Sequence, residues 1–142
     1  MRRPVIHPAW SNRYVDAQIR WRRDDQAWIG THCYGLVRLA YDEIGIELED
    51  YGPARDHDRI RLVDGAEAGP WTAVSNAVSN PIERRPFDVV VFDRGGFDDH
   101  CGLVVEPRLM LHLARSVGVA RCDPIDMGWG PVAGVYRHEA LS

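Results

Sequence analysis

The sequence has few cysteines, no long hydrophobic run and no excess of basic residues. Its three cysteines are an odd number at spacings that match no disulfide framework, which indicates free thiols and folding in a reducing compartment. No apolar stretch approaches membrane-spanning length, and Met1-Arg2-Arg3 is not followed by the core of a signal peptide. The net charge of −4 argues against general nucleic-acid binding. We therefore expect no nucleic-acid partner and no membrane insertion.

The 142 residues fit one domain, which at this length buries about two-thirds of its surface. The hydrophobic fraction of 45% and the charged fraction of 27% are ordinary for a globular protein. Pro4 and Pro8 discourage regular structure near the start of the chain. We therefore expect an N-terminal arm over residues 1–10 and a single domain over residues 11–142.

Cys33 lies just before an apolar segment whose residues have helical spacing. Apolar residues recur at helical spacing over 36–44 and Gly45 follows them, which predicts a helix from about residue 32 with Thr31 as its capping hydroxyl. Cys33 then lies on the first turn, where unpaired N–H groups and the helix dipole favour a thiolate. Gly35 leaves room for another chain segment or a substrate to approach the sulfur. The pattern is therefore typical of a nucleophilic cysteine.

Apolar runs between turn residues predict three successive strands, over 86–92, 100–105 and 109–114. In antiparallel neighbours joined by a short turn, His100 and His112 can face one another. Docked against the helix that carries Cys33, they would supply a base and a second imidazole to orient it. This is the arrangement that nucleophilic catalysis requires.

The other expected elements are less specific. They are a helix that follows Ser11 and carries Tyr14, Ala17 and Trp21 on one side, a long loop over 47–64, a short helix over 70–80, and strands over 118–122 and 132–138.

Four segments together resemble the NlpC-type family of papain-like cell-wall cysteine peptidases. They are Cys33-Tyr34-Gly35-Leu36-Val37, the strand over 86–92, His100-Cys101-Gly102-Leu103-Val104, and His112 twelve residues after His100. The similarity spans roughly residues 12–138 and is greatest to the short phage-tail and gene-transfer-agent members. It implies an α+β papain-like fold, in which N-terminal helices carrying the cysteine pack on a central antiparallel sheet carrying the histidines. By the same resemblance, Cys33 is the nucleophile, His100 the general base and His112 the residue that orients His100.

The resemblance also implies a substrate and a setting. Such peptidases mostly cleave peptidoglycan stem peptides, often beside D-glutamate and a diamino acid, and need no cofactor. We expect a chain made in the cytoplasm without a signal peptide and carried by a phage-like tail, with tail-tip proteins as partners, to periplasmic or cell-wall peptidoglycan. The family's pocket positions correspond here to Trp21, His32, Tyr34 and Gly35, so we expect these residues to bind substrate.

Two of these positions depart from the family. His32 stands where the family usually has an Asp that binds the free amino group of the substrate, and Trp21 stands where it usually has Tyr. These departures motivate an alternative, a catalytically silent tail-tip component that binds partners or cell wall through the same fold. A transferase or amidase that uses the same three residues on a different amide is a third interpretation.

A metal site is the remaining alternative. Zinc takes sulfur and imidazole ligands, but no Cys or His pair here has the usual short spacing. Cys101 adjoins His100 on a strand, so its side chain is expected on the opposite face, in the core. Asp93, Asp98 and Asp99 lack the spacing of a calcium loop. We therefore expect neither a metal nor a cofactor.

Overall fold

A six-stranded antiparallel sheet forms the centre of the computed structural model, which describes residues 4–48, 69–94 and 97–142. Across the sheet, the strands are ordered β3 (Trp71–Ala73), β8 (Val132–His138), β4 (Val89–Arg94), β5 (Phe97–Glu106), β6 (Leu109–His112) and β7 (Arg121–Pro124). Each strand is antiparallel to its neighbours. Strands β4 to β7 follow one another in both sequence and space, so local connections bring their residues together.

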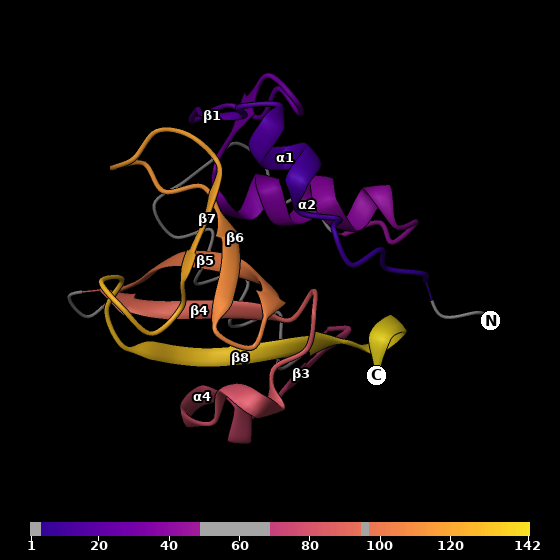
Figure 1. Cartoon of the computed structure of the whole chain (residues 1–142), viewed down its shortest axis with the longest axis vertical. Helices are drawn as coiled ribbons and strands as arrows, with labels where there is room; N and C mark the ends of the chain where they lie inside the picture. The colour runs from indigo at the N-terminus through magenta and orange to yellow at the C-terminus, as the bar shows by residue number, and fades with distance from the viewer. Residues whose placement is uncertain (1–3, 49–68, 95–96) are drawn as a thin grey trace.

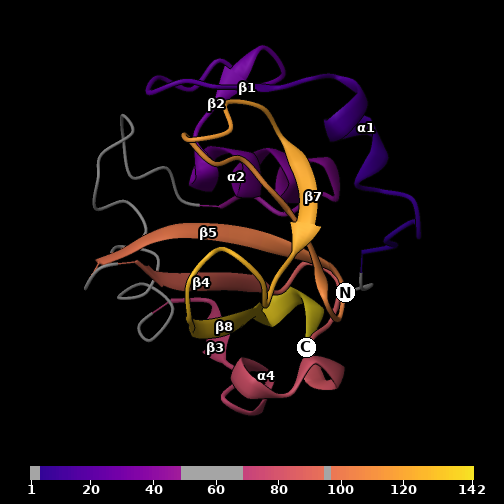
Figure 2. The same ribbon diagram turned by 60° about the vertical axis from the view of Figure 1, so that its left-hand side comes forward.

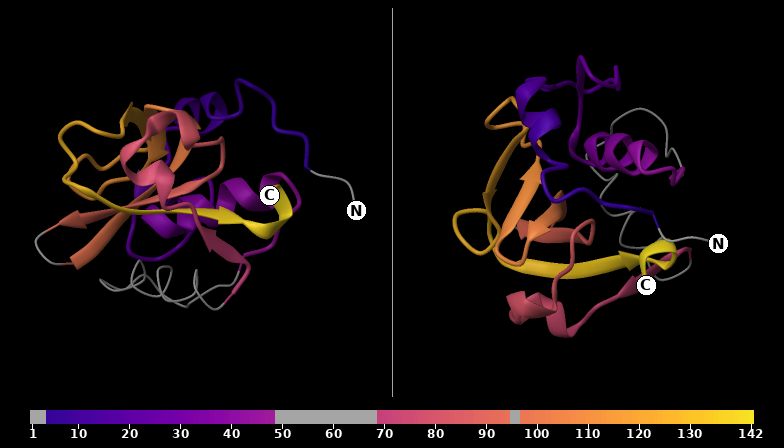
Figure 3. Two further views of the ribbon diagram at one scale, coloured as in Figure 1. Left: turned by 90° about the horizontal axis from the view of Figure 1, so that it is seen from below. Right: turned by 45° about the vertical axis from the view of Figure 1, so that its right-hand side comes forward.

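Helices cover both faces of this sheet (Figure 1, Figure 2). On one side lie α1 (Asn12–Asp16), α2 (Cys33–Glu43) and a parallel pair of short strands, β1 (Arg20–Trp21) and β2 (Gly30–Thr31); on the other side lies α4 (Asn76–Ser79). The described residues also include 3-10 helices at Pro81–Glu83 and Glu139–Leu141. Figure 3 shows the same layers from two other sides, with α2 and α4 on opposite faces. The α+β architecture expected from the sequence, in which N-terminal helices pack on an antiparallel sheet, is confirmed.

The unbroken apolar run of β4 is explained by burial on both faces. Val89 and Val91 belong to the larger core cluster, which includes the apolar face of α2. Val90 and Phe92 belong to a second cluster, which includes Ala77 of α4. Since successive side chains of a strand point to opposite faces, alternate residues of β4 supply the two clusters.

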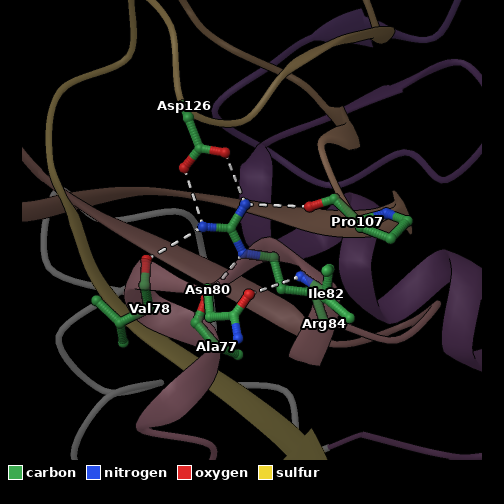
Figure 4. Close-up of polar contacts among 7 residues, drawn as sticks. All are labelled: Ala77, Val78, Asn80, Ile82, Arg84, Pro107 and Asp126. Atoms are coloured by element: carbon green, nitrogen blue, oxygen red, sulfur yellow. Dashed lines mark hydrogen bonds and ion pairs between the residues drawn. The ribbon is translucent and has the colours of Figure 1, made fainter.

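A buried arginine joins α4 to the connection between β7 and β8 (Figure 4). The side chain of Arg84 has 0% exposure, and its guanidinium pairs with both carboxylate oxygens of Asp126 at 2.8 and 2.9 Å. The same guanidinium donates to the backbone carbonyls of Ala77, Val78 and Pro107. These bonds neutralise the buried charge and fix the segment that leads to Trp129.

The helix predicted over residues 70–80 is wrong in its first half. Trp71 lies in β3 and pairs with His138 of β8, and only residues 76–79 form a helix. The helical spacing of Trp71, Val74 and Val78 was misleading, because Trp71 is buried against the sheet and only 6% exposed. Pairing with β8 outweighs the local periodicity.

The first predicted helix is shorter than expected. It ends at Asp16, Gln18 has a left-handed φ of 53°, and the chain then enters β1. Trp21 therefore lies on a strand beside Thr31 and not on the helix stripe with Tyr14. A right-handed helix cannot continue through a residue with a left-handed φ.

Several other boundaries also shift. β5 begins at Phe97, inside the predicted turn, β6 ends at His112, and β7 begins at Arg121. β8 spans the predicted residues.

Most of the long loop predicted over 47–64 lies outside the described residues. In the expected N-terminal arm, residues 4–10 form no helix or strand, although Trp10 packs against Phe87 with ring centroids 4.3 Å apart. Among the described residues, no helix has the length and apolarity to cross a membrane.

Candidate active site

Cys33 is the first residue of α2, as the sequence predicts. The helix cap differs from the prediction, because the ring nitrogen Nδ1 of His32 accepts a hydrogen bond from the Gly35 N–H at 3.2 Å. The Thr31 hydroxyl is buried and has no hydrogen-bond partner. His32 thus occupies the helix start as a cap, and Cys33 sits at the positive end of the helix dipole.

The surroundings of Cys33 favour its thiolate. A hydrogen bond with the Cys101 side chain lowers the pKa of the Cys33 thiol, and this effect outweighs burial, which acts in the opposite direction. A hydrogen bond with His100 and the charges of His100 and His32 lower the pKa further, so that it lies well below its usual value. A low thiol pKa near an imidazole is the property that makes a cysteine nucleophilic at neutral pH.

Cys101 has a role that sequence reasoning missed. It is fully buried and belongs to the core cluster, as expected. Its side chain nevertheless contacts Cys33, as does the neighbouring His100. The first residue of α2, the helix that packs on β5, thus meets the side chains of two consecutive residues of that strand.

The Cys101 contact predicts an effect on thiol reactivity. Cys101→Ala removes the hydrogen bond that does most to lower the pKa of Cys33, so alkylation of Cys33 at about pH 5.5 should slow roughly tenfold. Cys101→Ser keeps a donor at this position and should stay near the wild-type rate. Iodoacetamide labelling across pH, with each cysteine followed by peptide mass spectrometry, measures both. Identical profiles for the alanine variant and the wild type would contradict the prediction.

His100 and His112 meet as predicted. Their side chains are buried, and His100 Nε2 lies 2.7 Å from His112 Nδ1. Gly102 makes this approach possible, because it pairs with His112 across β5 and β6, and a Cβ at this position would lie 2.8 Å from the Met110 sulfur and 3.2 Å from the His112 Cβ. With Nε2 engaged by His112, the other ring nitrogen of His100 is the one left to serve Cys33.

An indole covers the two imidazoles. The ring of Trp129 stacks on His100 at a centroid distance of 5.4 Å and meets His112 edge-on at 4.4 Å. Phe92 stacks on His100 at 5.8 Å. These apolar surfaces reduce the contact of the imidazoles with water and strengthen the electrostatic interactions between them.

Asp123 continues the series of contacts that runs from Cys33 through His100 to His112. Asp123 of β7 places its carboxylate oxygen Oδ2 2.7 Å from His112 Nε2 and 2.6 Å from Arg121 Nε. Burial lowers the pKa of His112 to about 4, although the hydrogen bond to Asp123 acts in the opposite direction. Sequence reasoning missed Asp123, because its place beside His112 depends on the register between β6 and β7, in which Met110 pairs with Asp123.

The low pKa of His112 predicts a loss of stability in acid. The unfolded chain has a His112 pKa near 6.5 and the folded chain one of about 4, so the unfolded state binds more protons between these values. The free energy of unfolding should therefore fall as the pH falls through this window, by up to about 3 kcal/mol from His112.

Urea unfolding at several pH values measures this effect. His112→Gln should flatten the pH dependence between about pH 6.5 and pH 4.5, whereas substitution of the exposed His7 by Gln should leave it unchanged. If the free energy of unfolding of His112→Gln depends on pH as steeply as that of the wild type, His112 is not the source of the loss of stability in acid.

The residues expected to bind substrate lie around the start of α2, in different environments. Trp21 pairs with Thr31 in the short parallel ribbon, and its ring lies 5.1 Å from the Arg115 guanidinium carbon. Tyr34 is only 2% exposed and belongs to the core cluster. A Cβ on Gly35 would clash with Thr31 Oγ1, so the space that the glycine leaves is filled by the chain's own threonine.

No group of three or more His, Cys, Asp and Glu residues in the described part of the chain has an arrangement that could hold a metal ion. The chemistry that this site can perform is that of a thiolate beside the buried imidazole of His100, which is itself hydrogen-bonded through His112 to Asp123.

Solved structures of NlpC/P60 proteins are similar to this domain. NlpC2 from Trichomonas vaginalis matches with a TM-score of 0.66 and 15% identity, over 92% of this chain and 45% of that one. The peptidoglycan hydrolase RipB from Mycobacterium tuberculosis matches with a TM-score of 0.57 and 20% identity, over 92% of this chain and 63% of that one. The NlpC/p60 domain of the peptidoglycan hydrolase SagA matches with a TM-score of 0.57 and 14% identity, over 93% of this chain and 99% of that domain.

The chain thus spans about half the length of the first of these proteins and nearly all of the isolated domain. No protein-family model matches the sequence, and no curated protein matches it either. At these identities the likeness shows the fold alone, which is that of papain-like NlpC/P60 domains.

Proposed function

We propose that this chain is a cysteine peptidase of the NlpC type that hydrolyses amide bonds in the stem peptides of peptidoglycan. The observation that carries the proposal is the Cys33 thiol at the start of α2, with its pKa lowered and His100 in contact. The fold supports it, since RipB and SagA, two of the similar structures, are described as peptidoglycan hydrolases.

In the proposed mechanism, His100 takes the proton of Cys33 and the thiolate attacks the carbonyl carbon of the scissile amide. The Cys33 backbone N–H at the start of α2 stabilises the oxyanion of the tetrahedral intermediate. His100 then protonates the leaving amine, and the acyl group stays on the sulfur. Water activated by His100 releases the acid and restores the thiol. His112 orients His100 throughout.

The finer setting is also a proposal. The resemblance of the cysteine and histidine segments to phage-tail and gene-transfer-agent peptidases supports a role at the tip of a phage-like tail, where the enzyme would open peptidoglycan during wall penetration. Tail-tip proteins would be its partners. The resemblance also proposes substrate contacts at Trp21, His32, Tyr34 and Gly35, although the Tyr34 side chain lies in the core and Thr31 fills the space beside Gly35.

Digestion of purified peptidoglycan tests the proposal. Peptidoglycans with different diamino acids are incubated with the protein and with the same protein after its thiols are blocked by iodoacetamide, and the soluble products are identified by mass spectrometry. We expect stem-peptide fragments, each cut giving one new amine and one new carboxylate, from the untreated protein alone. Release of intact stem peptides would identify an amidase instead. A folded protein that releases nothing would favour the catalytically silent tail component.

A further inference from the structure

Asp123 is placed to control the state of His112. The carboxylate Oδ2 lies 2.7 Å from His112 Nε2, the His112 side chain is 1% exposed and that of Asp123 is 18% exposed. On its other side, the His112 ring meets His100 through Nδ1, also at 2.7 Å. Both nitrogens of the buried ring are therefore engaged, one by a carboxylate and the other by the imidazole that contacts Cys33.

A neutral imidazole carries one proton, and its two neighbours decide which nitrogen holds it. A carboxylate only accepts hydrogen bonds, so Asp123 requires the proton on His112 Nε2. Nδ1 is then an acceptor and takes a hydrogen bond from His100 Nε2–H. This leaves Nδ1 of His100 free to carry a second proton, and the resulting imidazolium is the partner that a thiolate needs.

We infer that Asp123 is a positioning residue, which fixes the Nε2-protonated form of His112 and thereby lets His100 hold its proton toward Cys33. Without this acceptor, the His112 proton can move to Nδ1 and point at His100 Nε2. His100 must then accept at Nε2, can carry only its Nδ1 proton, and becomes neutral. The Cys33–His100 pair then returns to thiol and imidazole. The catalytic consequence rests on the proposed function, whereas the protonation pattern does not.

The surroundings of Asp123 keep its carboxylate ionised and in contact with His112. Burial raises the pKa of its carboxyl, but the hydrogen bonds from His112 and Arg121 outweigh burial, so the pKa is lowered and Asp123 stays ionised at neutral pH. Arg121 pairs with His112 in the register of β6 and β7, which places its guanidinium beside the carboxylate. Trp129 covers the His112 ring at 4.4 Å, so water does not readily replace Asp123 as the acceptor.

The simpler interpretation is that Asp123 only ties β7 to β6 through an ion pair with Arg121. Three variants separate the two roles. Asp123→Leu keeps the branched shape of the side chain and removes the acceptor. Asp123→Asn can keep a carbonyl oxygen in the position of Oδ2, where one oxygen already accepts from both Arg121 and His112. Arg121→Gln breaks the ion pair and leaves the carboxylate in place.

Two measurements need no substrate. Nitrogen NMR of ¹⁵N-histidine-labelled protein distinguishes a protonated from an unprotonated ring nitrogen, and His112→Gln assigns the signals. Iodoacetamide labelling of Cys33 across pH reports its thiolate. We expect a protonated Nε2 at His112 in wild type and in Asp123→Asn, and a protonated Nδ1 in Asp123→Leu. The leucine variant should raise the pKa of Cys33 by about 1 to 2, with little change in Arg121→Gln.

If the proposed hydrolase activity is present, Asp123→Leu should lower kcat about ten- to one-hundredfold with little change in KM, and Asp123→Asn should restore most of it. An Nε2 proton and a wild-type labelling profile in Asp123→Leu would overturn the inference, as would an asparagine variant no better than leucine. A wild type that cleaves no peptidoglycan but shows the expected NMR and labelling pattern would reject the proposed function and keep the inference.

Discussion

Replacing Cys33 by alanine should reduce peptidoglycan cleavage by about 10⁴- to 10⁶-fold, the range seen when the nucleophile of a triad-type hydrolase is removed. The rest of the site cannot compensate. His100 loses the thiol that it deprotonates, and no other thiol of the chain has the position of Cys33 at the start of α2, since Cys101 is buried in the core and Cys122 lies in β7. Initial rates of fragment release, followed by mass spectrometry, measure the loss.

The matched control is Cys122→Ala. Cys122 is also partly exposed, but burial raises the pKa of its thiol, so this variant should cleave at about the wild-type rate. Thermal unfolding of both variants checks that the fold is kept, because removing one partly exposed sulfur atom costs about 1 kcal/mol or less. A folded Cys33→Ala protein that retains more than about a hundredth of the wild-type rate would exclude covalent catalysis by this thiol.

Substitution of Asp126 by alanine should lower the free energy of unfolding by about 3 kcal/mol, the low end of the range for breaking a buried ion pair. The low end applies because the Asp126 side chain is 39% exposed, whereas that of Arg84 has 0% exposure. The variant leaves a guanidinium buried without a counter-charge, and the three backbone carbonyls that remain bonded to it cannot neutralise it. Urea unfolding gives the change.

Asp24→Ala is the control for this experiment. Asp24 also pairs with an arginine, Arg22, but both side chains are exposed, so its loss should change the free energy of unfolding far less than the loss of Asp126 does. Arg84→Met combined with Asp126→Leu should cost less than the sum of the single changes, because the double variant leaves no unpaired buried charge. Equal, small effects for Asp24→Ala and Asp126→Ala would show that the buried pair contributes little.

The sequence allowed prediction of the parts of the fold and site that depend on local pattern. The helix that starts at Cys33 follows from apolar spacing, and β8 follows from a short apolar run after the turn residues near Pro131. The contact between His100 and His112 follows from the length of the turn between two strands. Each of these needs only residues that are near one another in the chain.

The missed features depend on partners that are distant in sequence. Trp71 has helical spacing with its neighbours but pairs with His138, near the other end of the chain. The contact between Cys33 and Cys101 arises only when α2 packs on β5. Asp123 needs the register of β7 against β6, and single-residue shifts in register cannot be inferred from composition or periodicity.

The order of strands in the sheet has a consequence for how the chain becomes reactive as it folds. His100, His112 and Asp123 come from three strands that are consecutive in sequence, so they can assemble through low-contact-order pairing with small loop-closure entropy. Cys33 arrives from a distant segment, and its docking closes a much longer loop. We expect His100, His112 and Asp123 to come together before Cys33 docks beside them. In a partly folded chain, Cys33 is therefore an ordinary, weakly nucleophilic cysteine. Its thiol becomes reactive only when α2 packs on β5.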